Sequence, residues 1–123
     1  MTKLPSLNKR TAPKSVMPER IVQFGEGNFL RAFVDWIVWN MDAKTNFNGS
    51  VVVVQPIDKG MVSWLNGQDC LYHVNLQGRL NGEPVNQLDR IDVISRAIDP
   101  YSQHYAYQAL AEQPEIRFVI SNT

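Results

Sequence analysis

The spacing of apolar residues changes sharply between residues 21 and 41. The apolar run 21–24 predicts a strand, and the small polar residues 25–28 predict a turn. After this turn apolar residues recur every three or four positions, which predicts a helix that packs through one face. That face comprises Leu30, Phe33, Val34, Ile37, Val38 and Met41. Arg31 and Asp35 share the other face, which we expect to be the more hydrated one.

Two tryptophans, Trp36 and Trp39, lie beside the main apolar stripe of this helix. Large aromatic side chains in such a position can mark a contact with a further domain or subunit. The alternative is a wide buried stripe, in which both indoles belong to the core. The sequence leaves both interpretations open.

A second strand follows the helix after a break at residues 44–50. Residues 51–54 are four consecutive valines without polar alternation, so both faces of this strand should be covered. A strand, a helix and a continuously apolar strand predict a parallel βαβ unit with a right-handed crossover.

The rest of the chain predicts a hairpin, a helix and a last strand. A short helix is expected at 61–65, and Tyr72, Val74 and Leu76 then alternate with polar residues. The pair Asn81 and Gly82 favours a two-residue hairpin turn. The return arm is expected to run from residue 83 towards 98, a helix from 99–100 to about 113, and a strand at 116–120.

Length and charge narrow the functional classes. The chain has 123 residues, enough for one domain with its own core, and its 12 Lys+Arg balance 12 Asp+Glu. This balance argues against nucleic-acid binding, which draws on excess positive charge. No apolar stretch approaches the roughly 20 residues of a membrane span. Cys70 is the single cysteine, which fits a reducing compartment.

The two ends of the chain carry further expectations. Residues 1–20 mix lysine, arginine and proline and lack the apolar block of a secretory signal, so we expect a flexible lead-in to a cytoplasmic protein. The domain proper should then occupy residues 21–123. A chain that stops at the end of a strand indicates a fragment of a longer protein, because the ligand crevice of an open sheet lies beyond that strand end.

The strongest candidate for chemistry is the turn formed by Gly25, Glu26 and Gly27. The first glycine permits a tight bend, and the second lets the backbone approach a pyrophosphate at the positive end of a helix. Leu30 occupies the place of the third glycine of the usual fingerprint, so close packing would have to come from Ala32. A purely structural turn is an equally open interpretation.

The charges around this turn act in opposite directions. The Glu26 carboxylate would repel a phosphate unless its side chain turns away, and Arg31 in the first helical turn would partly offset that repulsion. The dinucleotide interpretation also needs an acid after the second strand to hold a ribose. Asp58 is the first acid there, whereas its neighbour Lys59 would suit a 2′-phosphate, so NAD and NADP both stay open. A solvated charged loop is the competing interpretation.

Hydroxyl and amide side chains follow the last strand, where Ser121, Asn122 and Thr123 could meet a nicotinamide riboside. A capping or turn role is the alternative for these three residues. His73 and His104 are far apart, and no cysteine or histidine spacing predicts a metal site. We therefore predict no catalytic or metal-binding residue in this chain.

Four blocks of the sequence, 18–36, 51–57, 68–72 and 114–123, resemble the mannitol dehydrogenase family of long-chain polyol dehydrogenases. The family's phosphate-binding turn has a GxGxFxxA-like pattern, which Gly25, Gly27, Phe29 and Ala32 match. The blocks are most similar to family members that interconvert D-tagaturonate and D-altronate in bacterial hexuronate breakdown. The resemblance implies an α/β fold, namely part of a Rossmann-like NAD-binding domain with a parallel βαβ core and an added antiparallel hairpin.

The resemblance also implies what this chain does not carry. In the family, a catalytic lysine and its asparagine and histidine partners lie in a helical C-terminal domain, so no residue here takes those roles. The sugar acid would bind only with that domain, and this chain alone should be inactive. Together, the pattern of the residues and the resemblance give as candidate cofactor-binding residues Gly25, Glu26, Gly27, Asn28, Phe29, Arg31, Ala32, Asp58, Ser121, Asn122 and Thr123. A non-catalytic α/β binding or interaction module is the competing hypothesis.

Overall fold

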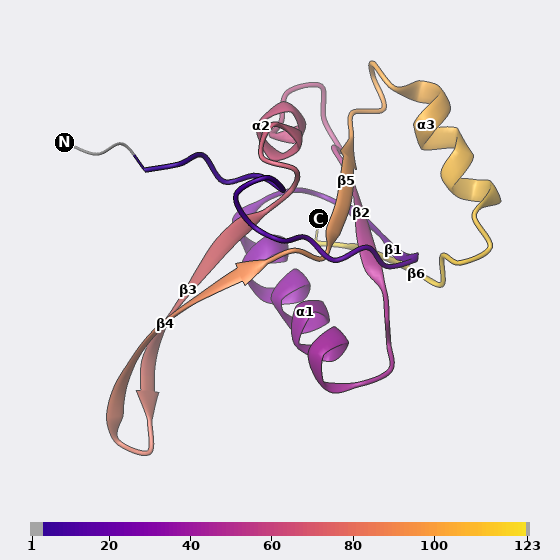
Figure 1. Ribbon diagram of the computed structural model, residues 1–123. Helices are drawn as coiled ribbons and strands as arrows, with labels where there is room; N and C mark the ends of the chain where they lie inside the picture. The colour runs from indigo at the N-terminus through magenta and orange to yellow at the C-terminus, as the bar shows by residue number, and fades with distance from the viewer. Residues whose placement is uncertain (1–3, 123) are drawn as a thin grey trace.

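The computed structural model describes residues 4–122, and its centre is a sheet of four parallel strands (Figure 1). The strands are β1 (Glu19–Phe24), β2 (Ser50–Val54), β5 (Ile94–Ile98) and β6 (Phe118–Ser121), in the order β5-β2-β1-β6. Each neighbouring pair is parallel, so the predicted βαβ unit is confirmed. The chain adds β2 and then β5 on one side of β1 and returns to place β6 on the other side. The strand order therefore reverses at β1.

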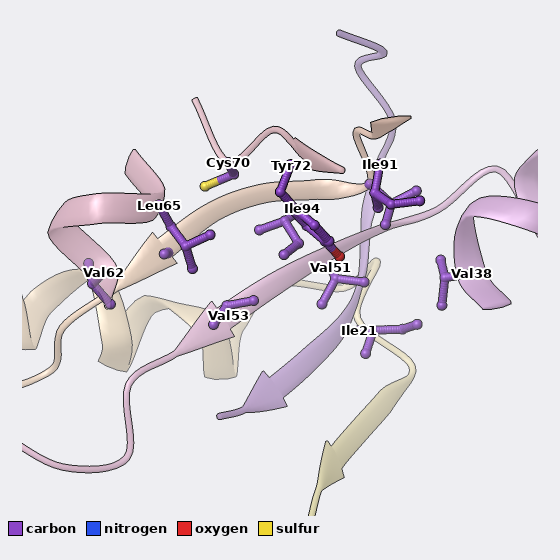
Figure 2. Close-up of a cluster of buried hydrophobic side chains, with 12 residues drawn as sticks. Ile21, Val38, Val51, Val53, Val62, Leu65, Cys70, Tyr72, Ile91 and Ile94 are labelled. Carbon is purple, nitrogen blue, oxygen red and sulfur yellow. The ribbon is translucent and has the colours of Figure 1, made fainter. Parts of the chain in front are cut away.

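Helices cover both faces of this sheet, as the unbroken valine run requires. The π-helical turn η1 (Leu30–Val34) leads into α1 (Asp35–Lys44), and one face of the sheet packs against α1 and α2 (Val62–Gly67). The other face packs against α3 (His104–Ala109) and the 3₁₀ turn η2 (Leu110–Glu112). Val51 and Val53 belong to the first core, which Figure 2 shows, and Val52 and Val54 belong to the second. The alternation follows from the pleat of the strand.

The predicted hairpin is present and projects away from the sheet (Figure 1). It consists of β3 (Tyr72–Leu80) and β4 (Glu83–Ile91). Asn81 and Gly82 form the turn with φ of 54° and 82°, the positive values that this residue pair tolerates. Only the base of the hairpin is buried, through Tyr72 and Ile91, which join the first core.

Two predicted boundaries were wrong. The return arm ends at Ile91, and residues 94–98 form the separate strand β5, which pairs with β2 and buries Ile94, Ala97 and Ile98. The helix expected from 99–100 begins only at His104. Asp99 does not cap this helix. Its Oδ1 accepts from the Tyr101 amide at 3.0 Å and so stabilises a turn that precedes the helix.

The expected hydrated face of the first helix was also wrong. Arg31 and Asp35 are buried, whereas Phe33 and Ile37 are exposed. For Asp35 the difference follows from η1, in which the Asp35 amide donates to the Leu30 carbonyl, five residues earlier. The extra residue in this turn rotates the following residues by about 100° from their place in an uninterrupted α-helix.

Both tryptophans of α1 contact the first core with part of their surface. Trp36 and Trp39 are half-buried and pack against the first core, and Trp36 Nε1 donates to Asp89 Oδ2 at 3.0 Å. Each indole therefore packs partly in the core, and a contact of its exposed part with a further domain or subunit stays a prediction.

Residues 4–18 make several polar contacts with loops of the domain. The Lys9 amide donates to Asp69 Oδ2 at 3.0 Å, and Lys14 Nζ donates to the Asp69 carbonyl at 2.6 Å. The Ser15 amide donates to Asp92 Oδ2 at 3.1 Å, and β1 already begins at Glu19. Residues 4–18 therefore lie against the domain by satisfying polar groups of its loops. Across residues 4–122, no helix combines the length and apolar character that crossing a bilayer requires.

Candidate functional site

The glycine turn lies at the carboxyl end of β1, between the ends of β2 and β6. Gly25 has φ of 125°, a conformation that favours glycine. Its amide donates to the Val54 carbonyl at 3.0 Å and extends the sheet by one bond. The Gly25 amide therefore completes the ladder between β1 and β2 and is not available to bind a phosphate.

Two buried side chains hold the next two carbonyls of the turn. Gln23 Nε2 donates to the Gly25 carbonyl at 3.0 Å, and Arg31 Nε donates to the Glu26 carbonyl at 2.8 Å. In a planar trans peptide the N–H points opposite to the C=O. Holding the Glu26 carbonyl towards Arg31 therefore directs the Gly27 amide away from the protein interior.

The helix that follows offers further amides at its N-terminus. Its first hydrogen bond runs from the Arg31 amide to the Gly27 carbonyl at 3.2 Å. The amides just before Arg31 therefore have no acceptor within the helix. A Cβ on Gly27 would find no atom within 4 Å. The turn thus presents an open backbone surface at the positive end of a helix.

Arg31 hydrogen-bonds to this turn from the buried side, whereas the sequence analysis expected it on the hydrated face of the helix. It is only 7% exposed, and its Nη2 donates to Asn28 Oδ1 at 2.7 Å. The guanidinium lies 5.3 Å from the ring centroid of Trp64 and 5.4 Å from that of Tyr72. Tyr72 Oη in turn donates to the Arg31 carbonyl at 2.8 Å. Arg31 therefore shapes the turn, and its charge is largely covered.

Glu26 turns away from the open side of the turn. Its residue is 8% exposed, and its carboxylate lies close to the Met61 amide. Burial raises the pKa of Glu26, while the Met61 amide, its own amide and the Arg31 charge lower it. From the sequence, the Glu26 carboxylate was expected to repel a phosphate unless its side chain turned away. The side chain does turn inward, which reduces this repulsion.

The small residue expected to bring helix and strand together is not in that place. Ala32 is exposed, and Leu30 lies over Gly25 instead, where an added Cβ would come within 3.0 Å of Leu30 Cδ1. Phe29 is exposed too, and its ring lies 5.3 Å from that of Phe33. The absent third glycine is thus accommodated by a leucine over the first glycine.

Asn122 and Ser121 lie beside the turn, as expected for the end of a neighbouring parallel strand. Ser121 pairs with Phe24, and a Cβ on Gly25 would lie 3.5 Å from Asn122 Oδ1. Both residues are exposed. Thr123 lies outside the described residues.

The loop after β2 keeps Asp58 and Lys59 exposed. Its shape is set by buried Gln55, whose Nε2 donates to the Ile57 carbonyl at 2.8 Å and whose Oε1 accepts from the Val62 amide at 3.3 Å. The loop lies at the same sheet edge as the glycine turn, since both follow the carboxyl ends of neighbouring parallel strands. A ribose contact by Asp58 stays a prediction.

Comparison with known proteins decides the family. The profile of the mannitol dehydrogenase Rossmann domain matches residues 19–121. This chain belongs to the mannitol dehydrogenase family. The resemblance inferred from the sequence and the predicted fold class are thereby confirmed.

Relatives of this mannitol dehydrogenase family member are close in sequence. It is 71% identical over 118 residues to the altronate oxidoreductase of Phocaeicola vulgatus and 72% identical over 118 residues to that of Bacteroides thetaiotaomicron. Both matches cover 96% of the chain but 25% of the relative. The chain therefore spans about a quarter of the length of these curated relatives.

Solved structures of the same fold are more distant. The chain is similar to Pseudomonas fluorescens mannitol 2-dehydrogenase in its ternary complex with NAD and D-mannitol, with a TM-score of 0.77 at 22% identity over 96% of this chain and 26% of that one. D-sorbitol dehydrogenase in substrate-free form gives a TM-score of 0.72 at 20% identity, covering 89% and 23% of the two chains.

Sequence reasoning missed two buried polar residues of this mannitol dehydrogenase Rossmann domain, Gln23 and Asp35. Both are 0% exposed, Gln23 on β1 and Asp35 at the start of α1. Burial raises the pKa of Asp35 to about 7, against lowering contributions from the Gln23 side chain and the Arg31 charge. The available signal was a glutamine inside an otherwise apolar strand that should be covered on both faces.

The described part of the chain offers no alternative chemistry. Residues 4–122 contain no cluster of three His, Cys, Asp or Glu side chains that could hold a metal ion. His73 and His104 are both exposed and come from separate elements. Cys70 is a free, buried thiol whose pKa is raised by burial to about 11. The glycine turn is thus the feature of the domain best suited to a ligand.

Proposed function

We propose that this chain supplies the NAD-binding region of an oxidoreductase that interconverts D-altronate and D-tagaturonate. The observation that carries the proposal is the glycine turn, whose Gly25 and Glu26 carbonyls are held inward by buried side chains. The choice of sugar acid is supported by the 71% identical relative, which is an altronate oxidoreductase. A reaction that draws on the cellular NAD pool, together with a free Cys70, fits a cytoplasmic protein.

The residues around the turn fit a dinucleotide. A pyrophosphate needs N–H donors, a positive helix end and close approach of the backbone. The first-turn amides provide the donors, and the empty space where a Gly27 side chain would lie permits the approach. The buried side chain of Glu26 keeps its carboxylate on the inner side of the turn.

Particular residues would hold each part of the cofactor. The amides of Gly27, Asn28 and Phe29 would bind the pyrophosphate, and Gly25 would set the bend. Asp58 would accept from the adenosine ribose, while Ser121, Asn122 and Thr123 would lie near the nicotinamide riboside. When bound, NAD supplies the hydride acceptor of the reaction. We expect the acid–base residues in a further domain, as the resemblance implies.

Cofactor binding is tested with Gly27→Val. A valine side chain would fill the space that a pyrophosphate needs, and Gly27 has neither a crowding neighbour nor a positive φ, so the fold should tolerate it. We expect saturable NADH binding by the unaltered chain and a loss of roughly tenfold or more in affinity for the variant, about 1.4 kcal/mol. Gly78→Val is the matched control, because Gly78 also has open space but lies on β3 in the hairpin.

NADH fluorescence and a circular dichroism spectrum of each variant give the readout. Equal affinity of folded Gly27→Val and the unaltered chain, or no saturable binding by any of them, would leave the chain as a non-catalytic α/β module.

The substrate assignment is tested with a chimera. The 118 residues of this chain replace the matching residues of the Phocaeicola vulgatus altronate oxidoreductase. We expect the chimera to reduce NAD with D-altronate, monitored by NADH absorbance, and to lose this activity when Gly27→Val is added. A folded chimera that lacks D-altronate oxidation would refute the assignment.

A further inference from the structure

Two buried polar side chains lie close to each other, and one of them contacts the glycine turn. Gln23 comes from β1 and Asp35 from the first residue of α1, and each is fully buried. Within residues 4–122, Gln23 Oε1 and both carboxyl oxygens of Asp35 have no hydrogen-bond partner. Three buried acceptors without a donor are costly, and so the arrangement needs an explanation.

A proton on Asp35 would supply the missing donor. A neutral carboxyl group carries one O–H, which can donate to an amide oxygen such as Gln23 Oε1. Burial favours the neutral form and holds the pKa of Asp35 at about 7, near the physiological range. The Gln23 nitrogen would then stay with the Gly25 carbonyl, to which it donates at 3.0 Å.

We propose that Asp35 is a positioning residue of the dinucleotide site and acts through Gln23 on the Gly25 carbonyl. The proposal rests on the proposed function, because the turn it positions is the pyrophosphate site. In the neutral form, the Asp35 O–H holds the Gln23 amide, and the Gln23 nitrogen holds Gly25. In the charged form, the carboxylate attracts the Gln23 nitrogen and weakens its bond to the Gly25 carbonyl.

Among the groups around Asp35, the Asp35 carboxyl is the one expected to gain or lose its proton near neutral pH. Arg31 from η1 faces it with a buried positive charge, and Tyr72 from β3 contributes a hydroxyl that is already donating to the Arg31 carbonyl. Asp89 on β4, which also packs near α1, accepts from Trp36 Nε1 and from Gln87 Nε2. Burial keeps the pKa of Tyr72 far above neutrality, so that hydroxyl stays protonated.

The test measures NADH affinity from about pH 6 to about pH 8.5 for three proteins. For the unaltered chain we expect affinity to fall as pH rises through about 7, by roughly tenfold, the equivalent of one hydrogen bond. Asp35→Asn keeps an N–H donor at every pH, so its affinity should be flat and exceed that of the unaltered chain at high pH. Asp42→Asn is the matched control, since Asp42 is the other aspartate on α1, is partly buried, and has its pKa raised by burial.

A second readout needs no cofactor. The amide chemical shifts of Gly25 and Glu26 should titrate with a midpoint near pH 7 in the unaltered chain and in Asp42→Asn, and should lose that transition in Asp35→Asn. Binding with the same pH profile in all three proteins would overturn the proposal while leaving the proposed function intact. Absence of NADH binding in all three would overturn the proposed function instead, and a shift titration lost only in Asp35→Asn would still support the link from Asp35 to the turn.

Discussion

Replacing Asp35 by asparagine should change how the stability of this domain depends on pH. The Asp35 carboxyl has a pKa near 3.8 when exposed and about 7 when folded. The folded state therefore holds a proton over a range in which the unfolded state has lost it, so raising the pH favours unfolding. The stability that the protonated Asp35 carboxyl contributes is lost between about pH 4 and about pH 7. Above that range this contribution no longer changes with pH.

The magnitude follows from the two pKa values. At 1.36 kcal/mol for each pH unit between them, a rise from 3.8 to about 7 corresponds to about 4 kcal/mol. This is a large share of the roughly 5–15 kcal/mol that stabilises an ordinary domain. Asparagine has nearly the same shape and no charge to bury, so Asp35→Asn should avoid this loss.

Urea unfolding at a series of pH values provides the assay, with tryptophan fluorescence and circular dichroism as independent probes. The informative quantity is the difference in unfolding free energy between Asp35→Asn and the unaltered chain, because Glu26 and Asp42, whose pKa values are also raised, contribute equally to both. The difference should grow by about 4 kcal/mol from about pH 4 to about pH 7 in favour of asparagine. A difference that does not change with pH would refute the reasoning.

Two further outcomes concern the backbone. Gly25→Ala should lower the unfolding free energy by about 1–3 kcal/mol in urea titrations, because of its φ of 125° and the 3.0 Å approach of Leu30 Cδ1, whereas Gly78→Ala should stay within about 0.5 kcal/mol. Equal losses would contradict the strain at Gly25. In hydrogen exchange, amides at the tip of the β3–β4 hairpin should exchange far faster than those of β2, since a two-stranded ribbon is marginal alone; equal protection would show that the tip is covered.

The fold was predictable where the sequence pattern of one element continued without interruption. Four valines with no polar alternation predicted a strand covered on both faces, and β2 is fully buried. Asn81 and Gly82 predicted the hairpin turn because few other residue pairs tolerate two positive φ values. The family resemblance extended these local predictions to the whole Rossmann domain.

The failures arose where a local pattern was interrupted by one residue or one turn. The helical period applied from Leu30 onward takes no account of η1, so it placed Asp35 on the wrong face. Asp99 is a good capping residue, and the sequence alone does not say whether it caps a helix or the turn before one. The break between β4 and β5 is similarly short.

The candidate site was predictable in its backbone but not in its supports. Two glycines between a strand and a helix locate the turn. The side chains that hold it, Gln23 and Arg31, are polar residues in a setting where polarity usually means exposure, and the sequence analysis accordingly placed Arg31 in water. Only their long-range packing against α1, β3 and α2 shows that they point inward.

The π-helical turn η1 also constrains how this segment can change in evolution. It lies between the glycine turn and the part of α1 that packs on the sheet, and it couples the two by residue count. Deleting one residue there would restore ordinary helical geometry but bring different side chains beneath the turn, moving Asp35 and Val38 out of the core together. Length between Gly27 and Val38 should therefore be under stronger selection than the identity of exposed residues such as Phe33 and Ile37.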